Sequence, residues 1–236
     1  MSQRFDDDQG NSGTFVPDRS FGVYGSSNAG YGVAGTSLAG NGVQGGSQSG
    51  FGVVGTSGAS HGVMGIAFGG DRNGAGVFAR GQVAGFFDGD VVVTGDIQLT
   101  GGDYAEDFDV IDSEAADPGT VMTLDELGAV RVSDQPYDTR AAGVISGAAG
   151  HKPAVILDRQ GPGTDRRPLA LMGKVYCKVD ASYGSIAVGD LLTTSATPGH
   201  AMKATNREKA FGAIIGKALM PQSAGRGLIP ILIALQ

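Results

Sequence analysis

Residues 21–70 repeat a ten-residue unit five times, and few folds accommodate such a sequence. The unit reads x-G-V-x-G-[ST]-S-x-[AS]-G, with Val at positions 23, 33, 43, 53 and 63 and a glycine before each of them. A ring side chain opens most units, as Phe21, Tyr31, Phe51 and His61. A fixed period of this kind indicates a stacked architecture in which each unit supplies one layer.

The glycines of the repeat also fit the nucleotide-binding pattern G-x-G-x-x-G. The matches are GYGVAG at Gly30–Gly35, GNGVQG at Gly40–Gly45 and GFGVVG at Gly50–Gly55. A phosphate-binding loop is needed once, between a strand and a helix, whereas here the pattern returns every ten residues. We therefore interpret the glycines as sharp corners and close backbone contacts, and we predict no nucleotide or other cofactor.

Each unit offers very little that a single chain could bury. Seventeen of the fifty residues are glycine, and none is Asp, Glu, Lys or Arg. Ten extended residues reach at most ~33–36 Å, enough for one short strand and a corner. Residues two apart share a face in an extended segment, so Phe51 and Val53 point the same way. Three chains that each supply one strand per layer would bring these side chains to a common axis and pair every strand edge.

We therefore expect a trimeric β-helical shaft over residues 21–102. Two alternatives remain open: a disordered linker, because Gly and Ser dominate, and a single-chain solenoid with two units per circuit. A flexible linker has no need for Val at every tenth position. Collagen is excluded because Gly does not occupy every third residue.

The repeat decays after Gly65. Asp71, Asn73 and Gly74 resemble part of a calcium loop, although a turn needs the same residues. The following segment, VAGFFDGDVVVTGDIQLTGG, is predicted to form the last shaft layers and to end in a glycine hinge at Gly101 and Gly102. Residues 1–20, with three consecutive aspartates, are predicted to be a flexible N-terminal segment.

Residues 103–236 have the composition of an ordinary globular domain and are predicted to form a compact, β-rich head. Their segments are short, β-branched and separated by turn residues such as DPG and TPG. The expected strands are Thr120–Leu124, Ala129–Val132, Ala142–Ser146, Pro153–Leu157, Leu169–Val179, Asp190–Ser195, Ala213–Leu219 and the C-terminal run. One short stretch, Thr205–Ala210, looks helical. The fold class predicted for the whole chain is all-β.

The C-terminal run GLIPILIALQ is apolar on both faces of an extended strand. It is too short to cross a bilayer, so we expect no membrane insertion. Both faces need to be covered, by the interior of the head or by a contact between subunits.

Several head segments resemble the C-terminal head domains of phage tail-fibre and appendage proteins. They are GGDYAEDFDV, DPGTVMTLDELGAVRVS, RAAGVISG, GKVYCKVDASYGSIAVGDLLTTSATPGHAMKA and GAIIGKAL. Similar heads follow a GVYGSS-type repeat in many bacterial proteins. The resemblance implies a homotrimer whose head registers and caps the shaft. Some relatives are intramolecular chaperones that cleave themselves once the trimer has formed, and acidic residues at the junction are the suspected agents. Here these would be Asp103, Glu106 and Asp107.

The side chains that could carry other chemistry are scattered. Cys177 alternates with Val175 and Val179 and is interpreted as a buried core thiol. No metal site is predicted, because His61, His151 and His200 lie far apart without ligand spacing. An axial ring of three His61 side chains in a trimer is a weak candidate for an ion or anion site.

Three further features contain residue types that occur in functional sites. Ser146 precedes a glycine but has no visible acid–His partner, so catalysis there is not expected. The charged stretch DRQGPGTDRR, residues 158–167, is interpreted as an exposed loop of the kind that often carries recognition. Tyr137, Tyr183 and His200 lie in or near turns and are candidates for stacking on sugars.

The expected function is that of a structural and adhesive fibre. The formal charge of −7 argues against nucleic acid as a partner. No signal peptide is visible, and one cysteine leaves the redox compartment open. We expect a soluble protein that is cytoplasmic when made and is then released on a phage-like particle. Its expected partners are copies of itself, a particle baseplate and a cell-surface glycan or other receptor. The alternative is a self-processing chaperone, and no enzyme acting on diffusible substrates is expected.

Overall fold

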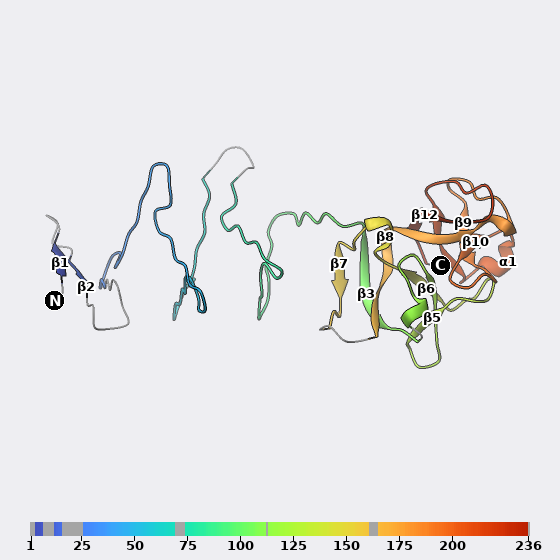
Figure 1. Ribbon diagram of the computed structural model, residues 1–236, viewed down its shortest axis with the longest axis horizontal. Coiled ribbons are helices and arrows are strands. Elements are labelled where there is room, and N and C mark those ends of the chain that lie inside the picture. The colour runs from blue at the N-terminus through green and yellow to red at the C-terminus, as the bar shows by residue number, and fades with distance from the viewer. Residues whose placement is uncertain are drawn as a thin grey trace. The chain divides into compact units, whose positions relative to one another are not determined.

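The computed structural model describes residues 3–6, 12–15, 26–68, 74–111, 113–160 and 165–235. The chain divides into two compact units, Met1–Asp90 and Val91–Gln236. Strands outnumber helical elements throughout the described residues (Figure 1), and helical structure is confined to three short 3-10 segments and one four-residue α-helix. The predicted all-β fold class is confirmed.

The first unit begins with a short hairpin. Strands β1 (Gln3–Asp6) and β2 (Ser12–Phe15) pair in antiparallel register, with Gln3 opposite Phe15. Two short paired strands therefore lie within residues 1–20, and the flexibility of this segment stays a prediction. The first half of the first repeat unit, Phe21–Gly25, and the calcium-loop candidates Asp71 and Asn73 lie outside the described residues. Gly74 is exposed.

The described repeats adopt one local geometry that recurs every ten residues. The side-chain oxygens of Ser27, Ser37 and Ser47 each accept a hydrogen bond of 2.9 Å from the backbone N–H three residues later. Ser57 does the same for Ser60 at 3.0 Å. A serine hydroxyl that accepts from a nearby backbone N–H stabilises a tight turn. This explains why serine occupies the same place in successive units.

The repeat glycines mark places where neighbouring units touch through their backbones. A Cβ atom on Gly42 would lie 2.6 Å from the carbonyl oxygen of Gly35, and a Cβ on Gly35 would overlap the carbonyl of Gly42. The pairs Gly45–Gly52 and Gly55–Gly62 show the same close approach. Glycine is required there because any side chain would occupy the space of the adjacent main chain.

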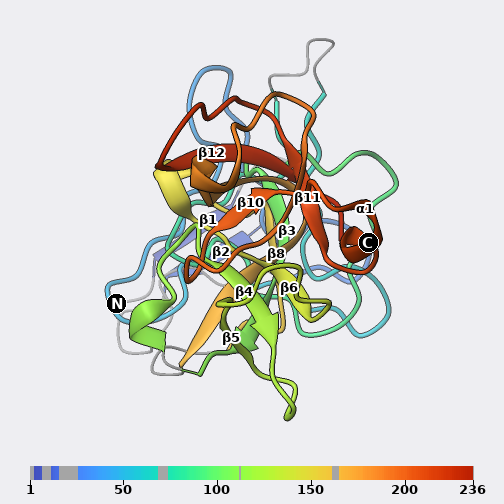
Figure 2. The same ribbon diagram turned by 90° about the vertical axis from the view of Figure 1, so that its right-hand side faces the viewer.

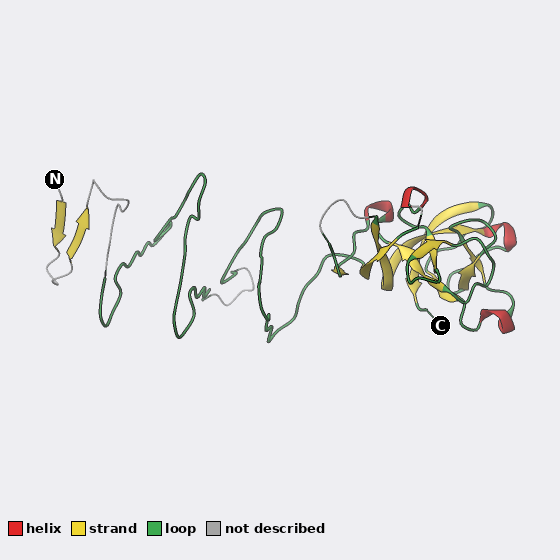
Figure 3. Cartoon of the chain, turned by 90° about the horizontal axis from the view of Figure 1, so that it is seen from below, coloured by secondary structure: helices red, strands yellow, loops and turns green. Residues whose placement is uncertain are grey.

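A single chain does not bury its repeats. Residues 26–68 and 74–100 contain no strand, and all of them are exposed (Figure 3). They therefore do not form the core that a single-chain solenoid requires. Their turns are regular. A β-helix also needs hydrogen-bonded strands, and residues 26–68 and 74–100 of a single chain form none.

The second unit is a β domain, which we call the head. Its strands are β3 (Asp103–Asp109), β4 (Val121–Leu124), β5 (Val130–Val132), β6 (Ala141–Ile145), β7 (Val155–Leu157), β8 (Arg166–Asp180), β9 (Leu191–Thr194), β10 (Ala201–Lys203), β11 (Ile214–Ala218) and β12 (Arg226–Ile233). The helical elements are η1 (Ser113–Ala115), η2 (Ala148–Gly150), η3 (Ala181–Tyr183) and α1 (Arg207–Ala210).

Five strands of the head close into a small barrel. The order β10-β9-β11-β12-β8 is completed by a parallel pairing of β10 with β8, at Ala201 and Val179 (Figure 2). Inward side chains alternate along β8 and β12, as strand geometry requires. The main hydrophobic cluster accordingly contains Val175, Cys177, Val179, Ile229, Ile231 and Ile233, all buried.

The long strand β8 connects the barrel to a second layer of pairing. Its N-terminal half pairs with β3 and β6, and its C-terminal half pairs with β12. Strands β4 and β5 extend the sheet from β6, and β7 pairs with β3. A second cluster, which includes Met122, Ile145 and Leu169, fills this half of the head.

Each of the eight segments predicted as strands overlaps an observed strand, β4–β9 and β11–β12. Strand β3 was not predicted, because four of its seven residues are acidic and acidic residues are rare in strands. The helical prediction matches α1, whose first turn is capped by Asn206. The Asn206 side chain accepts from the N–H groups of Glu208 and Lys209.

Asp180, at the end of β8, ties the barrel to its loops. Its carboxylate is buried and accepts from the Thr197 hydroxyl at 2.7 Å and from the Ser182 N–H at 2.9 Å. Arg226 Nε lies 3.7 Å from the same carboxylate. The hydrogen bonds from Thr197 and Ser182 lower the pKa of Asp180 from 3.8 to about 2.

Candidate functional site

The candidate site lies where the chain enters the head, at residues 100–103. The Gly102 N–H donates to the Lys152 carbonyl at 3.0 Å, and the Lys174 N–H donates to the Gly102 carbonyl at 3.0 Å. The Ala154 N–H donates to the carbonyl of Asp103 at 2.7 Å. The entering backbone is thus held between the loop before β7 and the middle of β8. A Cβ on Gly101 would overlap the main chain at Ala154, so this position requires glycine.

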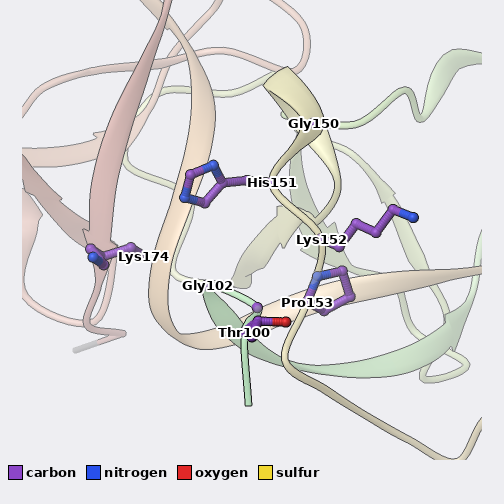
Figure 4. A pocket seen from close by; sticks show the side chains of 8 residues that line it. Thr100, Gly102, Gly150, His151, Lys152, Pro153 and Lys174 are labelled. Carbon is purple, nitrogen blue, oxygen red and sulfur yellow. The ribbon is translucent and has the colours of Figure 1, made fainter. Parts of the chain in front are cut away.

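A hollow of about 530 Å³ adjoins this entry segment (Figure 4). Three of its lining side chains are basic residue types: His151, Lys152 and Lys174. Figure 4 shows Lys152 extending away from His151. The full lining is Thr100, Gly101, Gly102, Gly150, His151, Lys152, Pro153 and Lys174. No acidic residue lines the hollow, so its electrostatic character favours negatively charged groups.

Asp103 is the buried acid of this region. Only 3% of the residue is exposed, and the Ser146 hydroxyl donates to its Oδ1 at 2.9 Å. Its Oδ2 has no hydrogen-bond partner among the described residues. Burial raises the pKa of Asp103, while the Ser146 hydrogen bond and the nearby His151 act in the opposite direction. The sequence shows no acid–His partner for Ser146, and the structure adds one acid, Asp103, because β3 and β6 both flank β8 and bring the two residues together.

This arrangement differs from a nucleophilic triad. In a Ser-His-Asp triad the imidazole stands between the hydroxyl and the carboxylate. Here the Ser146 hydroxyl donates directly to Asp103, and the His151 ring packs edge-on against Tyr176, with ring centres 5.3 Å apart. The geometry therefore orients and partly satisfies a buried carboxyl group rather than activating a serine.

The three acids suggested by the family resemblance do not converge within one chain. Asp103 and Asp107 are buried on one face of β3, whereas Glu106 lies on the other face and is half-buried. Four residues along a strand separate Asp103 from Asp107 by about 13 Å. Arg166 Nη2 donates to the backbone carbonyl of Asp107, whose Oδ1 has no partner among the described residues. The three acids of one strand therefore cannot act together on one peptide bond without a further group from another part of the protein.

Replacing Asp103 by Asn is expected to stabilise the head at neutral pH. The pKa of this carboxyl group is higher in the folded protein than the value near 3.9 of the unfolded chain. The free energy of unfolding is therefore largest below pH 3.9 and falls as pH rises through the folded pKa, because the buried group must then ionise. The asparagine removes that loss and keeps an acceptor for Ser146. Thermal unfolding at pH 4 and pH 7 checks this: the melting temperature of the variant should exceed that of the wild type at pH 7 only. An equal shift at both pH values would contradict it.

Cys177 is a core thiol, as predicted. It is fully buried inside the barrel, and burial raises its pKa to about 12. The Cys177 Sγ–H donates to the Lys178 carbonyl at 3.3 Å. A thiol that is protonated at neutral pH and inaccessible is a poor nucleophile.

The histidines do not gather into a site in the described residues. His61 is exposed, with its Nδ1 3.2 Å from the Ser60 hydroxyl, and His200 Nδ1 lies 2.8 Å from the Pro198 carbonyl. Among the residues described, no cluster of three His, Cys, Asp or Glu side chains could hold a metal ion. The axial His61 ring concerns several chains and stays a prediction.

Two of the candidate sugar-stacking tyrosines have structural roles. The Tyr137 oxygen accepts from the N–H groups of Thr205 at 2.9 Å and Asn206 at 2.8 Å, which holds the start of α1. Tyr183 OH lies 3.1 Å from the Thr197 hydroxyl, in the Asp180 network. Their hydroxyl groups are therefore used inside the head.

Replacing Tyr137 by Phe should cost about 0.5–1.5 kcal/mol of unfolding free energy, since two exposed backbone N–H groups exchange their protein acceptor for water. Chemical denaturation measures this. Tyr104→Phe is the matched control, because Tyr104 is 40% exposed and makes no described side-chain hydrogen bond. Equal stability of the two variants would show that the Tyr137 bonds are dispensable.

The loop at residues 158–167 is only partly described, because residues 161–164 are among those left out. Arg166 organises its ends. The Arg166 guanidinium bonds to Asp158 and lies 3.6 Å from Asp109 Oδ1. The loop is thus fastened at its base to β3.

The sequence did not point to the hollow at the chain entry. Its side chains come from residues 100–102, 150–153 and 174, which share no motif and no spacing. Only the pairing of β3 with β8 and β7 brings them to one place. The doubled glycine at Gly101 and Gly102 was the one signal, and it was interpreted as a hinge.

None of the helices in the described part of the chain has the length and apolar character to cross a lipid bilayer. No protein-family model matches the sequence. A search of curated proteins likewise finds no significant match.

Solved structures with a similar arrangement come from bacteriophage phi29. The C-terminal fragment of its gene product 12 is 15% identical, with a TM-score of 0.38 over 56% of this chain and 100% of that chain. The pre-mature gene product 12 has the same identity and TM-score over 65% of this chain and 24% of its own. The N base of the head fiber gp8.5 is 14% identical, with a TM-score of 0.29 over 56% of this chain and 90% of its own. This chain is thus similar, at low identity, to parts of two phi29 proteins.

Proposed function

We propose that this chain is a tail-fibre-like structural protein, in which three copies wind their repeats into a β-helical shaft and the heads hold them in register. One observation carries the proposal. The repeat valines Val33, Val43, Val53 and Val63 stay 64–71% exposed in a single chain, although they recur at a strict period in a segment without charged side chains.

The energetics favour burial between chains. Full burial of a valine side chain contributes about 1.5–3 kcal/mol, and a trimer would bury three per layer. The serine turns already set the local geometry of each unit, so association orders fewer residues. The close glycine contacts place one methyl group of Val43, Val53 and Val63 beside the glycine of the preceding unit. These valines are still 69–71% exposed and can meet side chains of other copies.

The head suits a registering role because it has its own hydrophobic core. A domain that folds first can bring three chains together at one end, after which the repeats pair from a common starting point. Contact with a cell-surface glycan or protein receptor would use exposed loops on the rigid head. A baseplate or other particle would hold the fibre.

Light scattering coupled to size exclusion tests the assembly. We expect a mass three times the 23.8 kDa of one chain. A monomeric mass across the accessible concentration range would overturn the proposal. Binding of the assembled protein to a glycan array then tests the adhesive role separately, and an array without hits would remove glycans as receptors.

A second candidate is self-processing at the chain entry. It is favoured by Asp103, a buried carboxyl group with a raised pKa directly after the Gly102–Asp103 peptide bond. Such a group can act as a general acid or base in hydrolysis by water. Denaturing gels of fresh and aged protein test it. Fragments that split near residue 103, and that vanish in Asp103→Ala, would support cleavage, while a stable full-length band would exclude it.

A further inference from the structure

Strand β12 is apolar on both faces, and only one of them is covered. Ile229, Ile231 and Ile233 point into the barrel and are at most 4% exposed. Leu228 and Leu232, on the other face, are each 42% exposed. A strand with two apolar faces is typical of a position covered on both sides. The second cover is absent from the described residues.

Leu232 belongs to a continuous outer face of the sheet. Cross-strand partners point to the same side of a sheet. Leu232 stands opposite Lys174 on β8 and Lys217 on β11. Tyr104 on β3 stands opposite Met172 on β8, which is 66% exposed. We call the surface formed by Tyr104, Met172, Lys174, Lys217 and Leu232 the outer face.

The two ends of this surface carry opposite charge. Lys174 and Lys217 lie at the barrel end, on β8 and β11, and Lys174 also lines the hollow with His151 and Lys152. Neither lysine forms an ion pair with any described residue. At the other end the half-buried Glu106 stands between Leu157 on β7, which is 39% exposed, and the fully buried Leu169 on β8. Glu106 too has no ion pair in the described part of the chain.

The β7 end of the sheet is also open in its hydrogen bonding. Strand β7 pairs with β3 and with no other described strand, so its far edge is unpaired. An unpaired edge beside apolar and acidic side chains is a surface that a second chain can cover. We call this end, formed by Tyr104, Glu106 and Leu157, the acidic end.

The proposed trimer requires a contact between two different patches. In a cyclic trimer the first patch of one copy meets the second patch of the next copy. A ring can therefore set the lysines of one copy against the acidic end of the next, where opposite charges attract.

We propose that the outer face is the contact between heads, with Lys174, Lys217 and Leu232 of one copy docking on the acidic end of a second copy of this chain. The cation-lined hollow beside Lys174 then receives negatively charged groups of the neighbour. This inference rests on the proposed trimer and names the head surfaces that form it.

Cysteine cross-linking of the full-length protein tests the pairing directly. Within one chain, Glu106 and Lys217 are separated by β8 and β12, three strand spacings of about 4.8 Å each. The variant E106C/K217C, treated with a short bismaleimide, should therefore yield covalent trimers on a denaturing gel. The native Cys177 is buried and does not compete. E106C and K217C alone should each stay uncross-linked.

The outcomes separate this inference from the proposed function. Cross-linked dimers of K217C alone would indicate a two-fold contact and overturn the ring. A wild type that is trimeric by light scattering, with no cross-linking of E106C/K217C, would overturn the outer-face contact alone. A monomeric wild type would overturn the proposed trimer as well.

A charge exchange provides an independent test that does not depend on linker reach. K174E/K217E and E106K should each weaken trimer association at least tenfold, as measured by analytical ultracentrifugation. The combined K174E/K217E/E106K protein should recover to within about threefold of the wild type, because the attraction is restored with reversed signs. L127D is the control for an added surface charge, since Leu127 is 92% exposed at the β4–β5 turn. If the combined variant associates as weakly as K174E/K217E or E106K, the proposed contact between heads is contradicted.

Discussion

Replacing Gly35, Gly45 and Gly55 together by Ala should abolish the ordered shaft. In each case the new methyl group would overlap the backbone carbonyl of the glycine at the second position of the next unit. Backbone atoms cannot rotate away as a side chain can, so each site should cost at least the upper end of the about 1–3 kcal/mol typical of overpacking. The effect adds over three layers because the sites lie in separate units.

The matched control uses three glycines of the same segment that have room for a methyl group. A Cβ on Gly30 would meet its nearest atom at 3.5 Å, and a Cβ on Gly46 or Gly58 would meet nothing within 4 Å. Protease resistance of residues 21–102 and trimer mass are the measurements. The first triple variant should lose both, while Gly30→Ala with Gly46→Ala and Gly58→Ala should keep them. Equal behaviour of the two triple variants would mean that the glycines serve flexibility rather than close contact.

Replacing Asp180 by Ala should destabilise the head by about 2–4 kcal/mol. The change removes the hydrogen-bond acceptor of the buried Thr197 hydroxyl and of the Ser182 N–H, and each unsatisfied group costs about 1–3 kcal/mol. It also removes the carboxylate beside Arg226. Chemical denaturation at pH 7 provides the measurement. Asp134→Ala is the matched control, because Asp134 pairs with Arg131 at the surface, where such a pair contributes little.

The Asp180 effect should depend on pH in a defined direction. The folded pKa, about 2, lies below the unfolded value near 3.9. The carboxylate therefore stabilises the fold fully above pH 4, and this contribution is lost as pH falls towards 2. The gap between wild type and Asp180→Ala should narrow over that window. A gap that is constant from pH 7 to pH 2 would show that the loss comes from packing alone.

The strands of the head could be predicted because their signals are local. β-branched runs such as those of β9 and β11 are bounded by turn residues, and alternation along β8 correctly placed Cys177 with Val175 and Val179 inside. The periodic serines and glycines of the repeat were equally visible, and their hydrogen bonds and backbone contacts occur within or between adjacent units. Such features depend on neighbours in the sequence.

The strand β3 and the candidate site could not be predicted in the same way. Acidic residues disfavour a strand on their own, yet Asp103–Asp109 pairs along its whole length with β8. The Ser146–Asp103 hydrogen bond joins residues 43 positions apart. A local sequence pattern cannot predict a contact between two residues that lie on different strands.

The sequence alone determined the repeat period, the positions of its turns and close contacts, the all-β class and the apolar character of both faces of β12. The tertiary structure decided which face of β12 the barrel covers, which acid is buried beside Ser146 and that His151, Lys152 and Lys174 line one hollow. The physical reason is the range of the interactions. Backbone conformation and side-chain alternation are set by adjacent residues, whereas burial, pKa shifts and charge placement depend on strands that meet only after the chain has folded.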